Sequence, residues 1–480
     1  MLEIFADVYE LLKQGETLKA KAMLDNMRQA GIIPEKNMWE FHELYGAIFY
    51  GLADAEGVAC AYLNAAKADT ILRSQREHYS NYLFALHYLA GISPADVARE
   101  HFKYQQLYRE ENFLPPPAIK NHAKLRVGFL ANAFLDSSSA RFYECLLKNL
   151  ASYAIDVFVY SLTNDQDDFT CELQASPLTY KALANKSILE SVSLIRNDEL
   201  DILIDLDGHS NGGMTLMLMA EKIAPLELMG IGYFATTGLT AIDGFITDSE
   251  LSPTGDEKYF SEALIRLPTA FCFTPTIKMQ NIARKRSTSA PIVFGVWQNY
   301  LKITSEAIKL WQEILAKIPD SILIVRDTTR LESRRTAIKE KFIQAGADLS
   351  RIKFILGSDD YLQDYNEIDI MLDTFPYTGG AMTATALYMG VPVVTLRGKC
   401  HGERLSAAII AAAGYREWIA ASPDEYIDIA VNLAINKDLL QLQQNLRAEM
   451  IDSRLMDSKA YVANFAAMLH NLKKQKGINL

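Results

Sequence analysis

Short apolar runs separated by helical segments are the feature of this chain that most restricts its fold. A first set comprises LRVGFL (125–130), IDVFVYSL (155–162), DILIDL (201–206), LELMGIG and IDGFITD, and a second comprises IVFGVW (292–297), SILIVRD, IKFILG, IDIMLDT and VPVVTL. Several of these runs are rich in β-branched residues, which is typical of parallel strands buried on both faces. Alternation of such strands with helices indicates βαβ units. The sequence therefore predicts an α/β fold with two doubly wound units in tandem.

Residues 1 to about 112 carry helical periodicity interrupted by turn signals. Large residues such as Trp39 and Tyr62 alternate with small ones such as Gly46 and Ala61, a pattern similar to a tetratricopeptide helix pair. An ordinary helical bundle without repeats is the alternative interpretation.

Three successive prolines at positions 115–117 block continuation of a helix, because proline lacks an N–H group and restricts the residue before it. We therefore place a domain junction there. The expected domains are a helical tetratricopeptide-like domain at 1–117, an N-terminal Rossmann-like lobe at 118–287 and a C-terminal Rossmann-like lobe with terminal helices at 288–480.

Composition excludes some classes of protein. The 480 residues carry a formal net charge of -11, which argues against a general nucleic-acid or membrane-surface binder but leaves local basic sites open. No window approaches 18 unbroken apolar residues, and the acidic N-terminus lacks the basic start of an export signal. The five cysteines are scattered without CxxC pairing, as expected of reduced thiols. We expect a cytoplasmic protein without a membrane span.

The segment 372–412 reads as strand, glycine turn, helix, strand, loop and helix, with Gly379 and Gly380 where the first helix begins. Unpaired N–H groups and the positive end of the helix dipole favour an anion there, and glycine permits a close approach to the backbone. The layout is that of a phosphate site, although many glycine turns only connect a strand to a helix.

Several motifs occur in an order that resembles the O-GlcNAc transferase and SPINDLY-like family of nucleotide-sugar protein glycosyltransferases, in particular its short bacterial members. The motifs are HYSNYLFALHYLAGISPADVAREH (78–101), LRVGFL, DILIDLDGHSNGG (201–213), GYFATTG with FITDSELSP, NYLKITSEAIKLWQEIL (299–315), and DTFPYTGG through VPVVTLRGKCHGER. The resemblance covers most of the chain. It implies a GT-B fold, in which two Rossmann-like lobes face a cleft behind tetratricopeptide-type helices, and an inverting sugar transfer from a UDP-sugar to a protein hydroxyl.

The resemblance also implies a donor-binding set. Lys302 matches the lysine that neutralises the donor diphosphate, and a fixed cation there would stabilise the charge of the leaving phosphate. Asn299, next to Gln298, matches an amide position near the phosphates. Backbone N–H groups facing the diphosphate would come from Gly379, Gly380, Ala381, Met382 and Thr383.

The chain departs from the family at several of these positions. Ala381 and Met382 stand where many members have threonines, and Thr385 replaces an acidic residue expected to hold the ribose. Tyr361 stands where relatives have a histidine that stacks on uracil, and it keeps an aromatic face for the base. These changes leave the backbone donors but put donor affinity and donor identity in question.

The resemblance implies roles in substrate binding or catalysis for three further loops. His209 matches the family's GH[ST] loop, and its imidazole suits proton transfer. A second family histidine is absent, and Ser137 beside Asp136 occupies its place, so Asp136 is a candidate base. His401 and Arg404, in GKCHGER, match a family loop after VPVVTL. For each position a structural role is the alternative.

No metal or other cofactor is expected. Asp205-Leu206-Asp207 has the spacing of a DxD metal motif, but the acids flank the end of a strand within a longer family motif. A lysine and helix N–H groups can neutralise a diphosphate without a cation.

The resemblance therefore predicts an enzyme that moves GlcNAc or a related hexose from UDP to Ser or Thr of an acceptor protein, with flagellin or a surface adhesin as the acceptor by analogy. The alternative is a catalytically silent subunit that keeps the fold and binds a partner, which the missing histidine and threonines favour. A small-molecule acceptor is a third reading. The sequence leaves the oligomeric state open.

Overall fold

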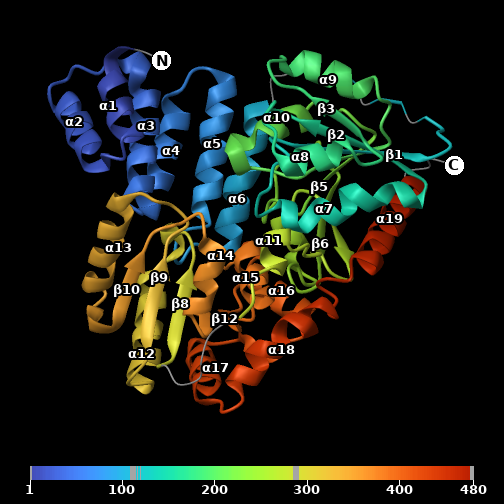
Figure 1. The fold of residues 1–480 in the computed structure, drawn as a ribbon. Helices are drawn as coiled ribbons and strands as arrows, with labels where there is room; N and C mark the ends of the chain where they lie inside the picture. The colour runs from blue at the N-terminus through green and yellow to red at the C-terminus, as the bar shows by residue number, and fades with distance from the viewer. Residues whose placement is uncertain (1–2, 109–114, 116, 119, 285–290, 476–480) are drawn as a thin grey trace. The chain divides into compact units, whose positions relative to one another are not determined.

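The computed structural model describes residues 3–108, 115, 117–118, 120–284 and 291–475 (Figure 1). Contacts between residues divide the chain into two compact units. Unit 1 contains Met1–Ile92, Thr276–Lys399 and Glu403–Met450, and unit 2 contains Ser93–Pro275, Cys400–Gly402 and Ile451–Leu480. Each unit is therefore assembled from segments that are far apart in the sequence.

Unit 2 is built on a seven-stranded sheet with the order β3-β2-β1-β4-β5-β6-β7. Its strands are β1 (Leu125–Ala131), β2 (Ile155–Ser161), β3 (Thr179–Ala182), β4 (Ile202–Asp205), β5 (Leu226–Gly230), β6 (Gly244–Asp248) and β7 (Ala263–Leu267). Every neighbouring pair is parallel. The chain order reverses between β1 and β4, as in a doubly wound Rossmann sheet.

Three helices of unit 2, α6, α8 and α9, begin at side-chain caps that the sequence supplies. Ser93 caps α6, whereas Asp167 and Ser187 form capping boxes at α8 and α9. The helices are α6 (Pro94–Tyr104), α7 (Ala140–Asn149), α8 (Asp168–Gln174), α9 (Ile188–Arg196), α10 (Met214–Met219) and α19 (Ser458–Gln475), with 3-10 turns η3 (Gln105–Tyr108), η4 (Leu150–Tyr153), η5 (Ser210–Gly213) and η6 (Asp256–Tyr259).

Unit 1 contains a six-stranded sheet with the order β10-β9-β8-β11-β12-β13. Its strands are β8 (Val293–Trp297), β9 (Ile322–Arg326), β10 (Ile352–Ile355), β11 (Ile370–Leu372), β12 (Val393–Leu396) and β13 (Ile419–Ala420). All pairs are again parallel. The order reverses between β8 and β11.

The remaining helices of unit 1 surround this sheet or belong to the N-terminal region. They are α1 (Ala6–Lys13), α2 (Thr17–Gln29), α3 (Met38–Gly51), α4 (Ala55–Ala68), α5 (Leu72–Leu86), α11 (Ile277–Gln280), α12 (Ser305–Lys317), α13 (Glu332–Gln344), α14 (Tyr361–Asp364), α15 (Ala381–Tyr388), α16 (Leu405–Ala413), α17 (Pro423–Ile435) and α18 (Leu439–Ile451). Short 3-10 turns are η1 (Glu3–Phe5), η2 (Glu35–Asn37), η7 (Tyr300–Lys302), η8 (Leu349–Arg351), η9 (Tyr365–Glu367), η10 (His401–Glu403) and η11 (Arg416–Trp418), of which η10 has its first two residues in unit 2 and its last in unit 1.

The N-terminal helices pack through a core of their own. Phe5, Val8, Leu24, Phe41 and Ile48 form this core, together with neighbouring buried residues. Close packing of α3 on α4 depends on a small residue, because a Cβ at Gly46 would lie 3.0 Å from the Tyr62 ring.

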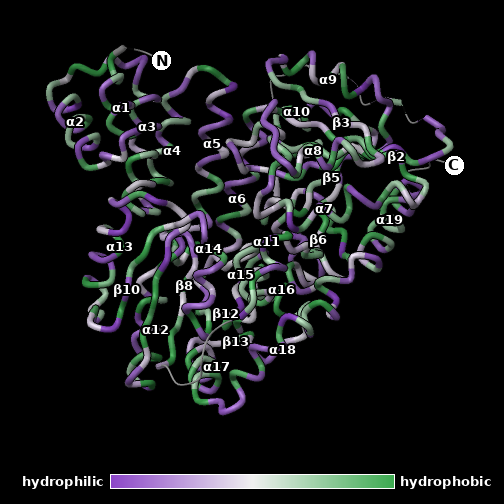
Figure 2. The backbone as a smooth tube through the Cα atoms, viewed as in Figure 1, coloured by the Kyte–Doolittle hydropathy of each residue, from purple (hydrophilic) through white to green (hydrophobic). Residues whose placement is uncertain are grey.

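The last helix, α19, packs against the sheet of unit 2 although the two are separated by most of the chain. Tyr461, Phe465 and Leu469 belong to the same buried cluster as β1 and β2. Lys473 Nζ contacts the Asp201 carboxylate at 3.1 Å, and both side chains are almost completely buried. Figure 2 shows hydrophobic residues along the strands and hydrophilic stretches along outer helices such as α13.

The predicted pair of parallel Rossmann-type sheets behind an N-terminal helical region is confirmed. The domain boundaries stay a prediction. The 287/288 boundary, Leu114 and Pro116 lie outside the described residues. In the structure, α1 to α5 belong to unit 1 and α6 to unit 2. Among the described residues, no helix combines the length and apolar character needed to cross a bilayer.

Candidate functional site

The point where strand order reverses in unit 1 brings together two of the loops singled out in the sequence. β8 and β11 are neighbouring parallel strands, so the segments that follow them leave the same edge of the sheet. One is the loop with Gln298 and Lys302, and the other contains Gly379 and Gly380. Ligands of doubly wound sheets bind at this position.

Lys302 lies directly beside the glycine turn. Its Nζ donates a hydrogen bond to the Thr378 carbonyl at 2.9 Å and lies 3.7 Å from the centroid of the Tyr377 ring. Removal from water lowers the pKa of Lys302 from 10.5 to about 8, and the nearby Asp373 carboxylate opposes this effect. An ammonium has three N–H donors. The Lys302 ammonium can therefore donate to a ligand as well as to the Thr378 carbonyl.

Asp373, which sequence reasoning missed, organises this turn. Its buried carboxylate accepts hydrogen bonds from the Gly379 N–H at 2.9 Å, the Gln298 amide at 3.1 Å and the Thr395 hydroxyl at 2.8 Å. Burial raises the pKa of Asp373. The sequence signal that could have identified Asp373 is its position directly after the apolar run IDIML. Gln298 therefore supports the loop through Asp373.

The two glycines serve different purposes. A Cβ at Gly379 would lie 2.5 Å from the Thr383 hydroxyl oxygen and 2.6 Å from the Gln298 amide nitrogen, so close packing requires glycine. A Cβ at Gly380, the residue before α15, would meet nothing within 4 Å. The approach to the start of α15 is open on that side.

The first turn of α15 offers main-chain donors. Ala381 and Met382 are half-buried, and the first N–H groups of a helix have no partner within it. Thr383 is buried, and its hydroxyl lies 2.7 Å from that of Ser406. Thr385 is also buried. The turn thus presents backbone N–H groups rather than threonine hydroxyls.

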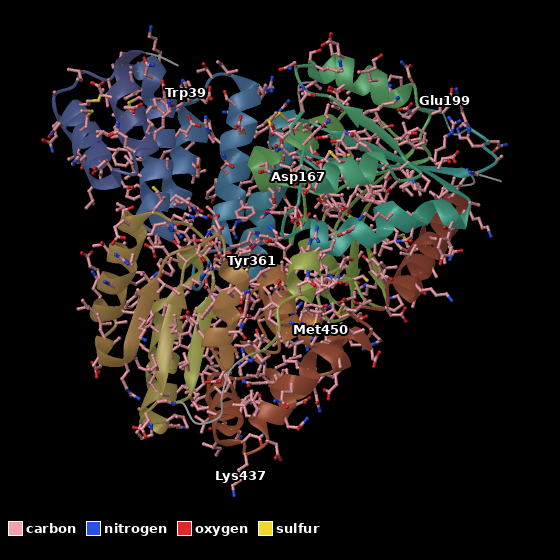
Figure 3. The ribbon with its side chains drawn as sticks, viewed as in Figure 1. Trp39, Asp167, Glu199, Tyr361, Lys437 and Met450 are labelled. Atoms are coloured by element: carbon pink, nitrogen blue, oxygen red, sulfur yellow. The ribbon has the colours of Figure 1, made fainter. Side chains whose placement is uncertain are left out.

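Asn299 and Tyr361 follow two different strands of the unit 1 sheet: Asn299 lies in the loop after β8, and Tyr361 lies after β10. The side-chain amide oxygen of Asn299 accepts from the Leu301 N–H at 3.0 Å and from Arg334 at 2.6 Å. Tyr361 begins α14 after β10, and the Arg326 guanidinium lies 6.0 Å from its ring (labelled in Figure 3).

A cavity of about 700 Å³ in unit 1 opens next to this region. Residues of α2, α12 and α13, of the loop after α3, of the start of α4 and of the segment after α5 line it, and Tyr88 lies in that last segment. The Tyr88 ring lies 5.5 Å from that of Tyr377, which covers Lys302. The N-terminal helices therefore approach the loop that carries the lysine.

The predicted pair His401 and Arg404 is divided between the units. His401 belongs to unit 2, where its Nδ1 lies 3.0 Å from the Ser252 hydroxyl and its ring meets Phe245 edge-on. Arg404 belongs to unit 1, and its guanidinium donates to the carbonyls of Gly398 and Lys399.

His209 follows β4 in unit 2 and is completely buried. Its Nε2 lies 2.9 Å from the Thr237 carbonyl, which can only accept, so this nitrogen carries the proton. The imidazole is surrounded by the rings of His101, Tyr104 and Tyr233, at 4.7 to 5.3 Å between centroids. The surroundings are those of a packed interior residue.

His101 shows how this cluster is held. Its Nδ1 donates to the Val97 carbonyl at 2.7 Å, so its Nε2 accepts from the Tyr233 hydroxyl at 2.8 Å. Burial lowers the pKa of His101 to about 4. The ring is therefore neutral at pH 7.

Asp136 follows β1 and is exposed, in contrast to His209. Its carboxylate forms an ion pair with Arg141 at 3.1 Å. Nearby, Asp207 accepts from the Asn132 N–H at 2.6 Å and Asp205 from the N–H groups of Asp207 and Gly208. Burial raises the pKa of Asp205 to about 7. These two acids order the loop after β4, and the expectation that the protein uses no metal stays a prediction.

Comparison with solved structures identifies the fold. The structure of the Thermobaculum terrenum O-GlcNAc transferase matches with a TM-score of 0.84 over 96% of this chain and 89% of that chain, at 24% identity. The fold is therefore that of a GT-B glycosyltransferase, with two Rossmann-type sheets.

Sequence comparison identifies the family. Residues 100–290 and 275–465 match glycosyl transferase family 41. Two similar proteins are described as probable UDP-N-acetylglucosamine–peptide N-acetylglucosaminyltransferase SPINDLY. The protein of Petunia hybrida is 30% identical, and the match covers 82% of this chain and 44% of that protein. The protein of Hordeum vulgare is 32% identical, and the match covers 79% of this chain and 42% of that protein. The chain belongs to glycosyl transferase family 41. It spans less than half the length of these curated relatives.

Proposed function

We propose that this protein is an inverting glycosyltransferase that moves GlcNAc or a related hexose from a UDP-sugar to a Ser or Thr hydroxyl of an acceptor protein. One observation carries the proposal: the Lys302 ammonium lies beside the start of α15 at the strand-order reversal of unit 1. A cation and main-chain N–H groups on one sheet edge match the charge of a diphosphate.

The chemistry follows from where charge develops. Breaking the bond between the sugar and UDP leaves negative charge on the departing phosphate, and a fixed cation with helix N–H groups stabilises that charge more strongly than the uncleaved donor. Because the pKa of Lys302 is about 8, most of the amine is charged at pH 7, and a bound anion would raise its pKa further. No metal is required in this proposal.

Acceptor activation is assigned to the loops of unit 2. The exposed Asp136 is the proposed group that takes the proton from the acceptor hydroxyl, because solvent reaches its carboxylate. His209 is buried, and we assign to it the support of the loop after β4. We further propose that the N-terminal helices are tetratricopeptide-like and bind the acceptor protein in the cytoplasm of a bacterium. A flagellin or surface adhesin as acceptor rests on analogy alone.

The test is release of UDP from UDP-GlcNAc and UDP-Glc by purified protein with lysate protein as acceptor. Lys302→Ala should abolish release, whereas Lys309→Ala, which removes an exposed lysine of α12, should not. Turnover that survives Lys302→Ala would refute the role of the lysine. Absence of sugar-nucleotide turnover by the wild-type protein would refute the enzyme assignment.

A catalytically silent subunit is the second candidate. It is favoured by the burial of His209 and by the inward position of the Thr383 and Thr385 side chains. This candidate predicts UDP binding without turnover, or neither, together with capture of a protein partner.

A further inference from the structure

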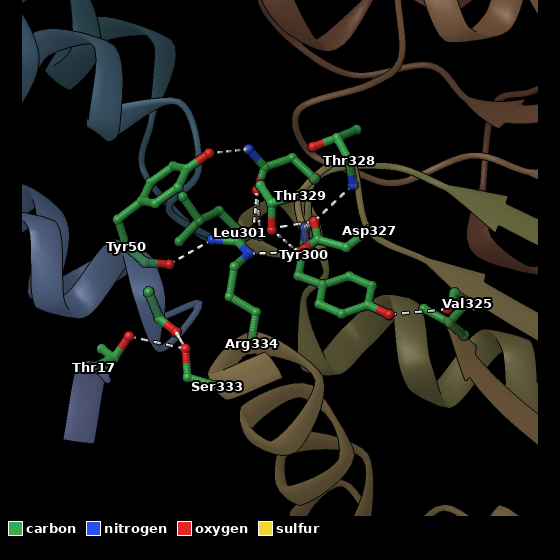
Figure 4. A network of polar contacts seen from close by, with 12 residues as sticks. Thr17, Tyr50, Tyr300, Leu301, Val325, Asp327, Thr328, Thr329, Ser333 and Arg334 are labelled. Atoms are coloured by element: carbon green, nitrogen blue, oxygen red, sulfur yellow. Dashed lines mark hydrogen bonds and ion pairs between the residues drawn. The ribbon is translucent and has the colours of Figure 1, made fainter. Parts of the chain in front are cut away.

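A buried arginine links the N-terminal helices to the loop that carries Lys302. Arg334, in the first turn of α13, has no exposed surface. Its Nε donates to the Asp327 carboxylate at 2.5 Å, its Nη2 donates to the side-chain amide oxygen of Asn299 at 2.6 Å, and its Nη1 donates to the backbone carbonyl of Tyr50 (Figure 4). One guanidinium therefore connects β9, the loop after β8 and the end of α3.

The contacts of Arg334 fix the backbone just before Lys302. Asn299, which Arg334 holds, also accepts from the Leu301 N–H at 3.0 Å, and Asp327 accepts from the Tyr300 N–H at 3.2 Å. The Lys302 N–H in turn donates to the Asn299 carbonyl at 2.9 Å. The first two N–H groups of the turn η7 are thus held by side chains that bind Arg334.

The same guanidinium is anchored on the N-terminal helices. It lies 4.6 Å from the centroid of the Tyr50 ring, a cation–π distance, and the Tyr50 hydroxyl lies 3.5 Å from the Asn299 amide nitrogen. A second contact between α13 and α3 does not extend to η7: the Ser333 hydroxyl donates to the Gly51 carbonyl at 2.6 Å. The chain therefore provides a matched pair of neighbouring residues, of which only one reaches the lysine loop.

We propose that Arg334 is a positioning residue for the donor site, which sets the place of the Lys302 ammonium by clamping Asn299 and Asp327 against the end of α3. The inference rests on the proposed function. It gives the N-terminal helices a role in the donor step, because Tyr50 supplies one face and one acceptor of the clamp. Lysine cannot replace arginine here, since its single ammonium lacks the planar fork that reaches three acceptors at once.

The experiment compares Arg334→Lys, Tyr50→Leu and Ser333→Ala. Titration calorimetry measures UDP affinity, and thermal unfolding monitors stability. Arg334→Lys keeps a cation beside Asp327 but loses the fork, and we expect UDP affinity and kcat to fall by on the order of tenfold or more. Tyr50→Leu should lower UDP affinity in the same direction by a few-fold, because the backbone carbonyl remains. Ser333→Ala should lower the Tm without changing UDP affinity.

The outcomes separate this inference from the proposed function. A wild-type chain that binds no UDP would overturn both. If wild-type protein binds UDP and loses it on Lys302→Ala, unchanged affinity in Arg334→Lys and Tyr50→Leu would overturn the inference alone. Equal losses of UDP affinity in Ser333→Ala and Tyr50→Leu would also overturn it, because the effect would then follow from general loosening of α3.

Discussion

Replacing Lys302 by methionine should stabilise the protein at pH 7 while removing its affinity for UDP. Burial lowers the pKa of Lys302 from 10.5 to about 8. Holding the charged ammonium in the folded protein therefore lowers the free energy of unfolding by about 3 kcal/mol. Because the side chain is only partly buried, solvent screening reduces this figure to about 2 kcal/mol. Methionine fills a similar volume without the charge.

The stability gain should depend on pH. Below pH 8 both the folded and the unfolded chain hold the proton, so the full cost of the charge is present. As the pH rises from about 8 toward 10.5, the folded protein releases the proton first and the cost disappears. The advantage of Lys302→Met should therefore shrink by about half or more between pH 7 and pH 9.5.

Urea unfolding of wild-type protein, Lys302→Met and Lys309→Met at several pH values measures this difference. The exposed Lys309 controls for loss of one positive charge. UDP should raise the unfolding midpoint of the wild type and of Lys309→Met only. A Lys302→Met protein less stable than wild type at pH 7, or a stability difference that does not change with pH, would refute a buried charge cost at Lys302.

Three further results are expected. Gly379→Ala should destabilise the protein by about 1–3 kcal/mol, because the new methyl group would overlap Thr383 and Gln298. Gly380→Ala should leave urea unfolding unchanged and weaken UDP binding. Equal stability losses in the two variants would contradict this difference in packing. The pKa of His101 is about 4 in the folded state, so the free energy of unfolding should fall by up to about 3 kcal/mol as the pH drops from 6.5 to 4. In His101→Gln the free energy of unfolding should depend less on pH over this range. An unchanged pH dependence would exclude His101 as the cause. Lys473→Met should cost about 3–5 kcal/mol in chemical unfolding, because the buried Asp201 carboxylate loses its counter-charge while still accepting from the Arg126 N–H. Adding Asp201→Leu should recover part of that loss, and no recovery would show that the loss has another origin.

Hydrophobic patterning was sufficient to locate the central strands of both sheets. LRVGFL corresponds to β1, DILIDL to β4 and IVFGVW to β8, each of which is buried along most of its length. The edge strand β3 has the sequence TYKA and mostly partial or full exposure, so it carries no apolar run to detect. Strand β13 is two residues long, too short for any periodicity.

Contacts between distant segments of the chain were beyond sequence reasoning. Arg334 and Tyr50 are separated by 284 positions, and neither has a local pattern that indicates its partner. His209 was selected for its loop motif, but the burial of its ring depends on aromatic residues from α6 and on Tyr233. Lys302 and the glycine turn could be paired in advance, because both follow apolar runs whose strands lie side by side in a doubly wound sheet.

A crystal structure of this protein with UDP would show whether Lys302 and the start of α15 hold the diphosphate. We expect diphosphate oxygens within hydrogen-bonding distance of Lys302 Nζ and of the N–H groups of Ala381 and Met382. A diphosphate bound elsewhere, with the Lys302 amine still donating only to the Thr378 carbonyl, would contradict it.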